Sequence, residues 1–291
     1  MKKSKLGFTL IEVALFLAVT GALFVSIAVG VQQSIYQQRQ NDAVNSFIEF
    51  LRSAYAGVTN VQNTGGGRSD QAIYGKLITF GETHNLAGDE INGGNPGNEV
   101  FMYTVKGNIR EGNANSGSDS NADIIDLLRN RGVNILNETE GDNPQWEYAG
   151  IAESYTPKWA TEIQAPCEPD ATIAQCNFTP LQASILIVRH PTTGTIYTLY
   201  AGTTIQVNAT VKESKERRNI SSADGPLKPF LDSGVSASQR FQKFQQIDFC
   251  INTTGENGVA NRPDVRIESG AKNSSAINTV SADMEDYRCG R

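Results

Sequence analysis

The chain has 291 residues, a formal net charge of -6, and 39% hydrophobic against 19% charged residues. This length is sufficient for a sizeable hydrophobic core, and the acidic balance argues against a general phosphate-binding surface. With 2 His and no Gly-x-Ser-x-Gly, His-Glu-x-x-His or phosphate-loop motif, the sequence predicts no enzymatic activity.

A long apolar segment lies close to the N-terminus. Residues 8–31 are uncharged except for Glu12, and they follow a basic leader, residues 1–7. About 20 apolar residues suffice to cross roughly 30 Å of hydrocarbon, and lysines ahead of such a run favour the cytoplasmic side. A secretory signal peptide would have a shorter apolar region closed by a small-residue cleavage site. We therefore expect a membrane helix with the rest of the chain outside the cytoplasm.

Glu12 is the one acidic residue inside this segment. A carboxylate there costs on the order of 2 to 3 kcal/mol near the bilayer centre and less towards its edge. Two explanations stay open at this point. Glu12 lies at the interface and reaches water, or the chain is cut after Gly7, so that the new α-amine of Phe8 pairs with the carboxylate on a neighbouring subunit.

The run Gly7-Phe8-Thr9-Leu10-Ile11-Glu12-Val13 resembles the cleavage and methylation motif of type IV pilins and type II secretion pseudopilins. The resemblance covers residues 1 to about 55. It implies that a prepilin peptidase cleaves after Gly7 and methylates Phe8, and that Glu12 acts in assembly. It also implies other pilin subunits, a pilus or secretion assembly machinery and the lipid bilayer as partners. The expected location is the bacterial inner membrane, single-pass, and then an extracellular filament on the cell surface.

Residues 32–58 are predicted to continue the helix as an amphipathic half. Their apolar residues recur mostly at steps of three, four and seven, which places them on one helical stripe. Gln40 and Arg52 are among the residues of the opposite, polar face. We therefore expect a leader at 1–7, a membrane or filament-core helix at 8–31, its amphipathic continuation at 32–58, and a head at 59–291. The predicted stripe consists of Ile35, Tyr36, Ala43, Val44, Phe47, Ile48, Leu51, Ala54, Tyr55 and Val58.

The head is predicted to be rich in strands and long loops. Residues 183–189 and 195–200 are β-branched and aromatic runs around a proline and glycine turn, which predicts a hairpin. Together with the N-terminal helix, this indicates an α+β fold whose head is similar to the β-rich heads of minor pilins. Further strands are expected at 100–105, 202–211, 244–252 and 264–268, a short helix at 122–131, and loops at 60–70, 84–98 and 107–121.

Four cysteines, Cys167, Cys176, Cys250 and Cys289, lie in the part expected to be exported, where disulfides form. Three pairings are possible. Nearness in sequence favours Cys167 with Cys176 and Cys250 with Cys289, and the second pair resembles the C-terminal loop disulfide of many pilins. A zinc site is the weaker alternative because the chain has no Cys-x-x-Cys.

Two kinds of ligand were weighed for the head. The acidic segment from Asp89 and Glu90 to Asn98 and Glu99 offers oxygen ligands for calcium, but without EF-hand spacing, so no cofactor is expected. Basic residues around Arg217 and Arg218, with Arg262 and Arg266, are interleaved with acids, which argues against nucleic acid as a partner.

Together these patterns predict a structural subunit, namely a minor pilin or pseudopilin of a type IV pilus or related filament. Two alternatives remain. One is a signal-anchored surface adhesin that never polymerises, which would keep its leader. The other is a minor pilin that binds DNA during uptake.

Overall fold

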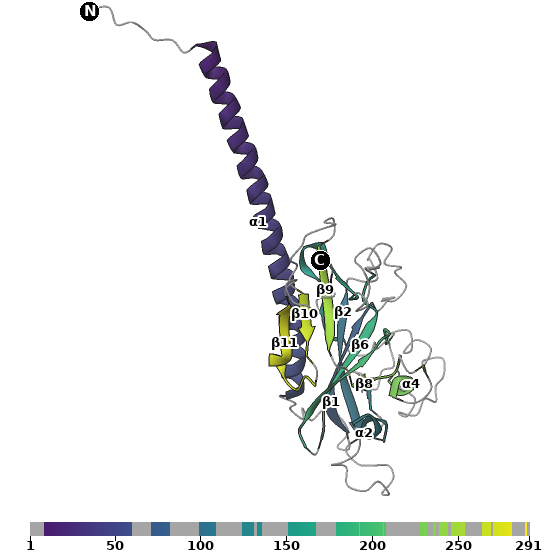
Figure 1. Ribbon diagram of the computed structural model, residues 1–291. Coiled ribbons are helices and arrows are strands. Elements are labelled where there is room, and N and C mark those ends of the chain that lie inside the picture. The colour runs from purple at the N-terminus through teal and green to yellow at the C-terminus, as the bar shows by residue number, and fades with distance from the viewer. Residues whose placement is uncertain are drawn as a thin grey trace, which may run out of the picture.

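The computed structural model describes sixteen stretches of the chain. They are residues 9–59, 71–81, 99–108, 124–130, 133–135, 151–166, 179–191, 193–205, 207, 227–231, 235–236, 239–243, 246–253, 264–268, 270–280 and 289. In these stretches one long helix precedes a head made of strands and short helices (Figure 1). The predicted α+β class, a long N-terminal helix on a β-rich head, is confirmed.

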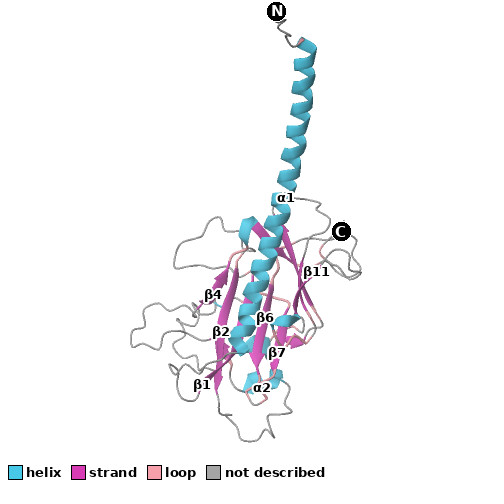
Figure 2. Ribbon diagram, turned by 90° about the vertical axis from the view of Figure 1, so that its left-hand side faces the viewer, coloured by secondary structure: helices cyan, strands magenta, loops and turns pink. Residues whose placement is uncertain are grey.

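Helix α1, Leu10–Thr59, has 50 residues, which is about 75 Å at 1.5 Å per residue. Its first half projects away from the head, and its second half lies along the sheets (Figures 1 and 2). Of the predicted stripe, the residues from Ala43 to Val58 are buried, whereas Ile35 is exposed because it lies in the projecting part. The apolar stripe thus meets the head only from about residue 40 onwards.

The larger sheet forms the centre of the head. It contains β1 (Gln71–Phe80), β2 (Val100–Asn108), β3 (Asn134–Ile135), β6 (Ala183–Arg189), β7 (Ile196–Ala201) and β8 (Gln242–Lys243) in the order β3-β2-β1-β6-β7-β8, and β4 (Ile151–Tyr155) also pairs with β2. All described pairings in this sheet are antiparallel. The predicted hairpin is β6 and β7, closed by a turn in which Gly194 has φ 69° and donates its N–H to the carbonyl of His190.

The smaller sheet lies beside α1 and covers the core from another side. Its order is β11-β10-β9-β5, formed by β5 (Thr161–Gln164), β9 (Ile247–Thr253), β10 (Asp264–Ile267) and β11 (Ile277–Val280). An ion pair joins two of its strands: Arg266 Nε of β10 lies 2.6 Å from Asp248 Oδ1 of β9. Asp248 is buried, so this pair satisfies a charge that would otherwise be costly inside the head.

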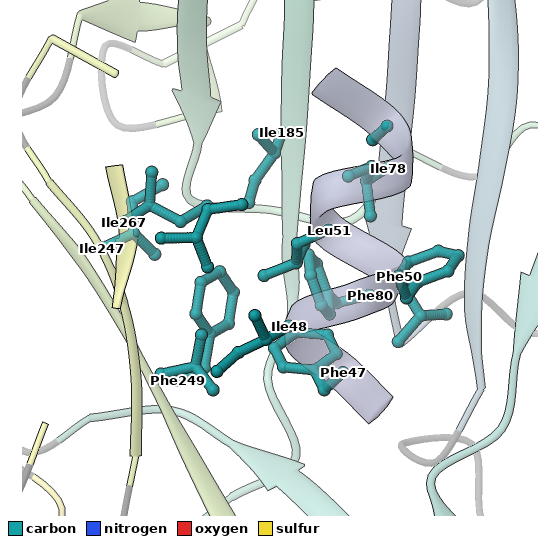
Figure 3. Packing of buried hydrophobic residues seen from close by; sticks show 14 of the residues in the cluster. Phe47, Ile48, Phe50, Leu51, Ile78, Phe80, Ile185, Ile247, Phe249 and Ile267 are labelled. Carbon is teal, nitrogen blue, oxygen red and sulfur yellow. The ribbon is translucent and has the colours of Figure 1, made fainter. Parts of the chain in front are cut away.

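The main core lies where α1 meets both sheets (Figure 3). Phe47 of α1 is fully buried there, with its ring centroid 6.2 Å from Phe80 on β1 and 5.2 Å from Phe249 on β9. Tyr155 on β4 lies 5.7 Å from the same ring. One helical side chain therefore holds three strands from two sheets together.

Tyr55 connects the helix to the head by a buried hydrogen bond. Its hydroxyl lies 2.8 Å from Thr198 Oγ1 on β7, and Thr198 Oγ1 donates at 2.9 Å to the carbonyl of Ala271. Because the threonine proton is used in that second bond, Tyr55 is the donor in the first. Burial raises the pKa of Tyr55 to about 12.

A second core lies on the other face of the larger sheet. Neighbouring residues of a strand alternate between the two cores: Ile78 and Ile185 face the α1 side, and Leu77 and Leu186 face the second core. Helices α2 (Ile124–Asn130) and α4 (Lys228–Leu231) contribute to this second core. The predicted short helix at 122–131 is confirmed by α2, whose Ile124, Leu127 and Leu128 are buried and whose Ile125 is partly buried.

One predicted strand differs from the structure, and strands β1, β3, β4, β5, β8 and β11 were not predicted. The strand expected at 202–211 is wrong over residues 202–205, where the Ile205 N–H donates to the Ser184 side chain instead of a neighbouring strand. Strand β1 was not predicted, because Gly75 and Lys76 interrupt its apolar pattern. Gly75 is needed there: a Cβ at this position would lie 2.0 Å from the carbonyl oxygen of Ile187 on the adjacent strand.

Candidate functional site: the projecting helix and its junction with the head

The projecting half of α1 is an uncovered apolar surface. Every exposed large hydrophobic residue in the described part of the chain lies on this half, except Trp159. Exposed fractions on the helix run from 43% at Ile35 to 86% at Leu10, so the head covers none of these side chains. A surface of this extent needs a membrane or other protein chains. It comprises Leu10, Ile11, Val13, Leu15, Phe16, Leu17, Val19, Leu23, Phe24, Val25, Ile27, Val29, Val31 and Ile35.

Two hydroxyl groups within this apolar half are satisfied inside the helix itself. Thr20 Oγ1 donates to the carbonyl of Phe16, and Ser26 Oγ donates to the carbonyl of Ala22 at 2.6 Å. A polar group without a partner is costly in hydrocarbon, so these internal bonds suit a helix that lies in lipid. By length and composition α1 is able to span a membrane.

The helix begins with a capping arrangement formed by Thr9 and Glu12. Glu12 Oε2 accepts hydrogen bonds from the Thr9 backbone N–H and from Thr9 Oγ1, each at 2.9 Å. In return, the Glu12 N–H donates to Thr9 Oγ1 at 3.3 Å. This reciprocal pattern is a capping box, which fixes the start of the helix and holds the carboxylate at its N-terminal end. Gly7 and Phe8 lie outside the described residues, so the predicted cleavage and methylation positions stay predictions.

Three contacts fix the helix where it leaves the head. Gln40 Nε2 donates at 2.7 Å to the carbonyl of Ile251, and Ser46 Oγ lies 2.8 Å from the Tyr155 hydroxyl. The Arg39 guanidinium lies 5.1 Å from the ring centroid of Trp159, in cation–π contact. Gln40 was predicted on the polar face, yet it is buried because its amide satisfies a strand carbonyl. Because these partners are far apart in sequence, no local pattern indicates them.

The predicted disulfide between Cys250 and Cys289 is present, with the two Cα atoms 5.2 Å apart. It attaches the C-terminal part of the chain to β9. Asp264 lies beside it: a carboxylate oxygen and the two sulfur atoms lie within 4.8 Å of one another. Since the sulfurs are bonded to each other, they are not thiolates available to a metal ion. Cys167 and Cys176 lie outside the described residues.

The two ligand sites weighed from sequence fall mostly outside the described residues. Of the acidic segment considered for calcium, Glu99 is described and is exposed, whereas Asp89, Glu90 and Asn98 are not described. Of the basic residues considered for nucleic acid, Arg266 is described. Its guanidinium is engaged by Asp248, so it does not contribute an unpaired cation to a phosphate-binding surface.

Comparisons with protein-family models, with curated proteins and with solved structures find no match for this chain.

Proposed function

We propose that the chain is a structural subunit, a minor pilin or pseudopilin of a type IV pilus or related filament. Its N-terminal helix is held in the inner membrane until a prepilin peptidase cuts after Gly7 and methylates Phe8. The helix then joins the filament core, and the head is displayed outside.

The observation that carries the proposal is the uncovered apolar half of α1 together with the position of Glu12. The head buries the helix only from Gln40 onwards, which leaves about 45 Å of rod for lipid or for neighbouring helices. Glu12 lies in the first turn of that rod. A single-pass anchor requires the apolar length but does not require the carboxylate of Glu12.

The proposed role of Glu12 is electrostatic. In the filament its carboxylate neutralises the α-amine of Phe8 on an adjacent subunit, so that extraction from lipid buries a pair of opposite charges instead of an isolated one. Oε2 already accepts two hydrogen bonds from Thr9, and these hold the carboxylate at the helix start. The pairing then gives assembly a defined register between subunits.

The first test is the N-terminus of the mature chain. Mass analysis of the protein from cells with an active prepilin peptidase should find a methylated Phe8 as the first residue. A chain that still begins at Met1 would favour the signal-anchored adhesin and overturn the proposal.

The second test is Glu12→Ala, with Glu49→Ala as a matched control. Both are acidic residues of α1, and Glu49 is exposed on the part that packs on the head. Glu12→Ala should leave membrane insertion intact and strongly reduce incorporation into filaments, whereas Glu49→Ala should assemble like the parent. Quantitative blotting of sheared filaments against membrane fractions measures both. Normal incorporation of Glu12→Ala would refute the assembly role.

A further inference from the structure

Trp159 is an exposed aromatic residue held in an unusual conformation at the base of the projecting helix. Its side chain is 53% exposed, and it is the one exposed large hydrophobic residue of the described chain that lies outside α1. It is also the one described non-glycine residue with a positive φ, 63°. A left-handed backbone is unfavourable for a bulky residue, so the surrounding structure holds Trp159 against an intrinsic preference.

Two cations accompany the ring. Arg39 of α1 lies over one face of Trp159, and the neighbouring Lys158 is exposed. Arg39, Lys158 and Trp159 are called the Trp159 cluster below. Asp42 is the nearest acidic residue on the same helix, one turn further into the head. The cluster is thus aromatic and carries two positive charges.

When the helix is in a bilayer with Val31 at the edge of the hydrocarbon, the backbone of Arg39 lies about 5 to 7 Å outside the headgroup layer, a distance that an arginine side chain can bridge. Arg39 is eight residues beyond Val31, about 12 Å along the helix axis. A headgroup layer extends about 5 to 7 Å beyond the hydrocarbon. The Cα–Cβ bond of a helical residue tilts towards the helix N-terminus, so the side chain of Arg39 leaves the backbone in the direction of the membrane. A typical helix tilt of about 20° from the bilayer normal brings one side of the head closer to the membrane surface.

We propose that the Trp159 cluster is a binding site for the phosphate headgroups of anionic lipids on the outer surface of the membrane. The inference rests on the proposed function in one respect, which is that the helix is held in a bilayer before assembly. Tryptophan is enriched at membrane interfaces because its ring is apolar while its indole N–H remains hydrated. Cations near an anionic surface strengthen binding, and Arg39 and Lys158 supply them. The site fixes the tilt of α1 and the orientation of the head before extraction into the filament.

The chain itself offers a fluorescent probe. It contains 2 Trp, so Trp146→Phe leaves Trp159 as the sole tryptophan. The full-length variant is reconstituted into vesicles of equal parts phosphatidylcholine and phosphatidylglycerol, and into vesicles of phosphatidylcholine alone. Two quenchers are compared, a nitroxide on the lipid headgroup and acrylamide in the water. Vesicle flotation reports insertion independently.

The expected result is strong quenching of Trp159 by the headgroup nitroxide in the anionic vesicles. Arg39→Gln with Lys158→Gln should reduce that quenching at least about twofold, because two cations near the surface are lost. The matched control, Lys243→Gln with Lys272→Gln, removes the same charge elsewhere, and its Trp159 should be quenched as strongly as in the parent. Lys272 follows Ala271, whose carbonyl contacts Thr198 beside Tyr55, far along α1 from Arg39.

Three outcomes would overturn the inference. Quenching by the headgroup nitroxide that is no stronger in the anionic vesicles than in vesicles of phosphatidylcholine alone would exclude binding of anionic headgroups. Equal quenching in the parent and the Arg39/Lys158 variant would exclude a role for these two cations in headgroup binding. Protection from acrylamide that grows with protein concentration, without headgroup quenching, would identify a second copy of the chain as the occupant. Each of these leaves the proposed function standing if flotation shows insertion, whereas failure to float would contradict the proposed function itself.

Discussion

Phe47→Ala should unfold the head more easily than any change on the projecting half of the same helix. Phe47 is fully buried and makes edge-to-face contacts with Phe80 and Phe249, one on each sheet. Burying a phenylalanine stabilises by about 1.5 to 3 kcal/mol. Each such aromatic pair adds about 0.5 to 1.5 kcal/mol. The cavity left by truncation adds a further cost, so the expected loss in free energy of unfolding is about 3 to 5 kcal/mol.

The measurement is urea unfolding of the full-length chain in detergent micelles, followed by near-ultraviolet circular dichroism. The matched control is Phe24→Ala, the same substitution on the same helix at a residue that is 71% exposed. Phe24 lies on the uncovered apolar half of α1, so its loss should leave the unfolding midpoint of the head unchanged. A loss below about 1 kcal/mol for Phe47→Ala would refute the assignment of α1 as the connection between the two sheets.

Three further predictions concern the head. Cys250→Ser with Cys289→Ser should lose about 4 kcal/mol of unfolding free energy, from loop entropy at a sequence separation of 39, and an unchanged urea midpoint would contradict it. The pKa of Tyr55 is raised from 10.0 to about 12, so its contribution to stability is complete below pH 10 and is lost as the pH rises towards 12. Tyr55→Phe should reduce that loss of stability at alkaline pH. The remaining loss is due to Tyr155 and Tyr200, whose pKa values burial also raises. If the unfolding free energy of parent and variant depends on pH in the same way, Tyr55 does not contribute to the loss. Arg266→Ala leaves the charge of buried Asp248 without its partner and should lower the free energy of unfolding by about 3 to 5 kcal/mol. Asp126→Asn breaks an exposed pair with Arg129 and should lower it by less than about 1 kcal/mol. Similar thermal midpoints of the two variants would refute this difference between the buried and the exposed pair.

The sequence predicted those parts of the fold whose evidence is local. Helix α1 follows from an apolar run joined to an amphipathic stripe, and its end at Thr59 lies one residue beyond the expected boundary. The β6 and β7 hairpin follows from two β-branched runs around a short turn. In both cases the partners are adjacent in sequence, so spacing alone identifies the contact.

The missed features depend on contacts between distant residues. Gly75 interrupts the apolar pattern of β1. Its role is apparent only in the folded head, where the backbone of β6 leaves no room for a Cβ at this position. Gln40 lies on the polar side of the helical stripe, but a strand more than two hundred residues later supplies a carbonyl for it. Trp159 is unremarkable in sequence, and its role at the junction depends on Arg39. Local propensity carries no information on such pairings.

In the proposed function, the partition of the subunit between the bilayer and the filament depends on few groups. Lipid tails are as apolar as leucine, so moving the apolar half of α1 from lipid into a bundle of helices gives little hydrophobic gain. A carboxylate that lacks a charge partner in lipid and finds one in the filament shifts the balance by at most about 2 to 3 kcal/mol, which is the cost at the bilayer centre. That energy corresponds to about 30-fold to 150-fold in partition. One acidic residue can therefore decide whether the subunit leaves the membrane.

Glu12→Gln separates two roles of Glu12, its negative charge and its capping hydrogen bonds with Thr9. The amide keeps an oxygen that accepts hydrogen bonds from Thr9 at the helix start, but it removes the charge. If the charge drives extraction from lipid, Glu12→Gln should fail to assemble as Glu12→Ala does. If the capping bonds matter instead, Glu12→Gln should assemble like the parent, and Thr9→Ala should reproduce the defect. Measuring filament incorporation of all three variants therefore assigns the energy of assembly to the ion pair or to the start of the helix.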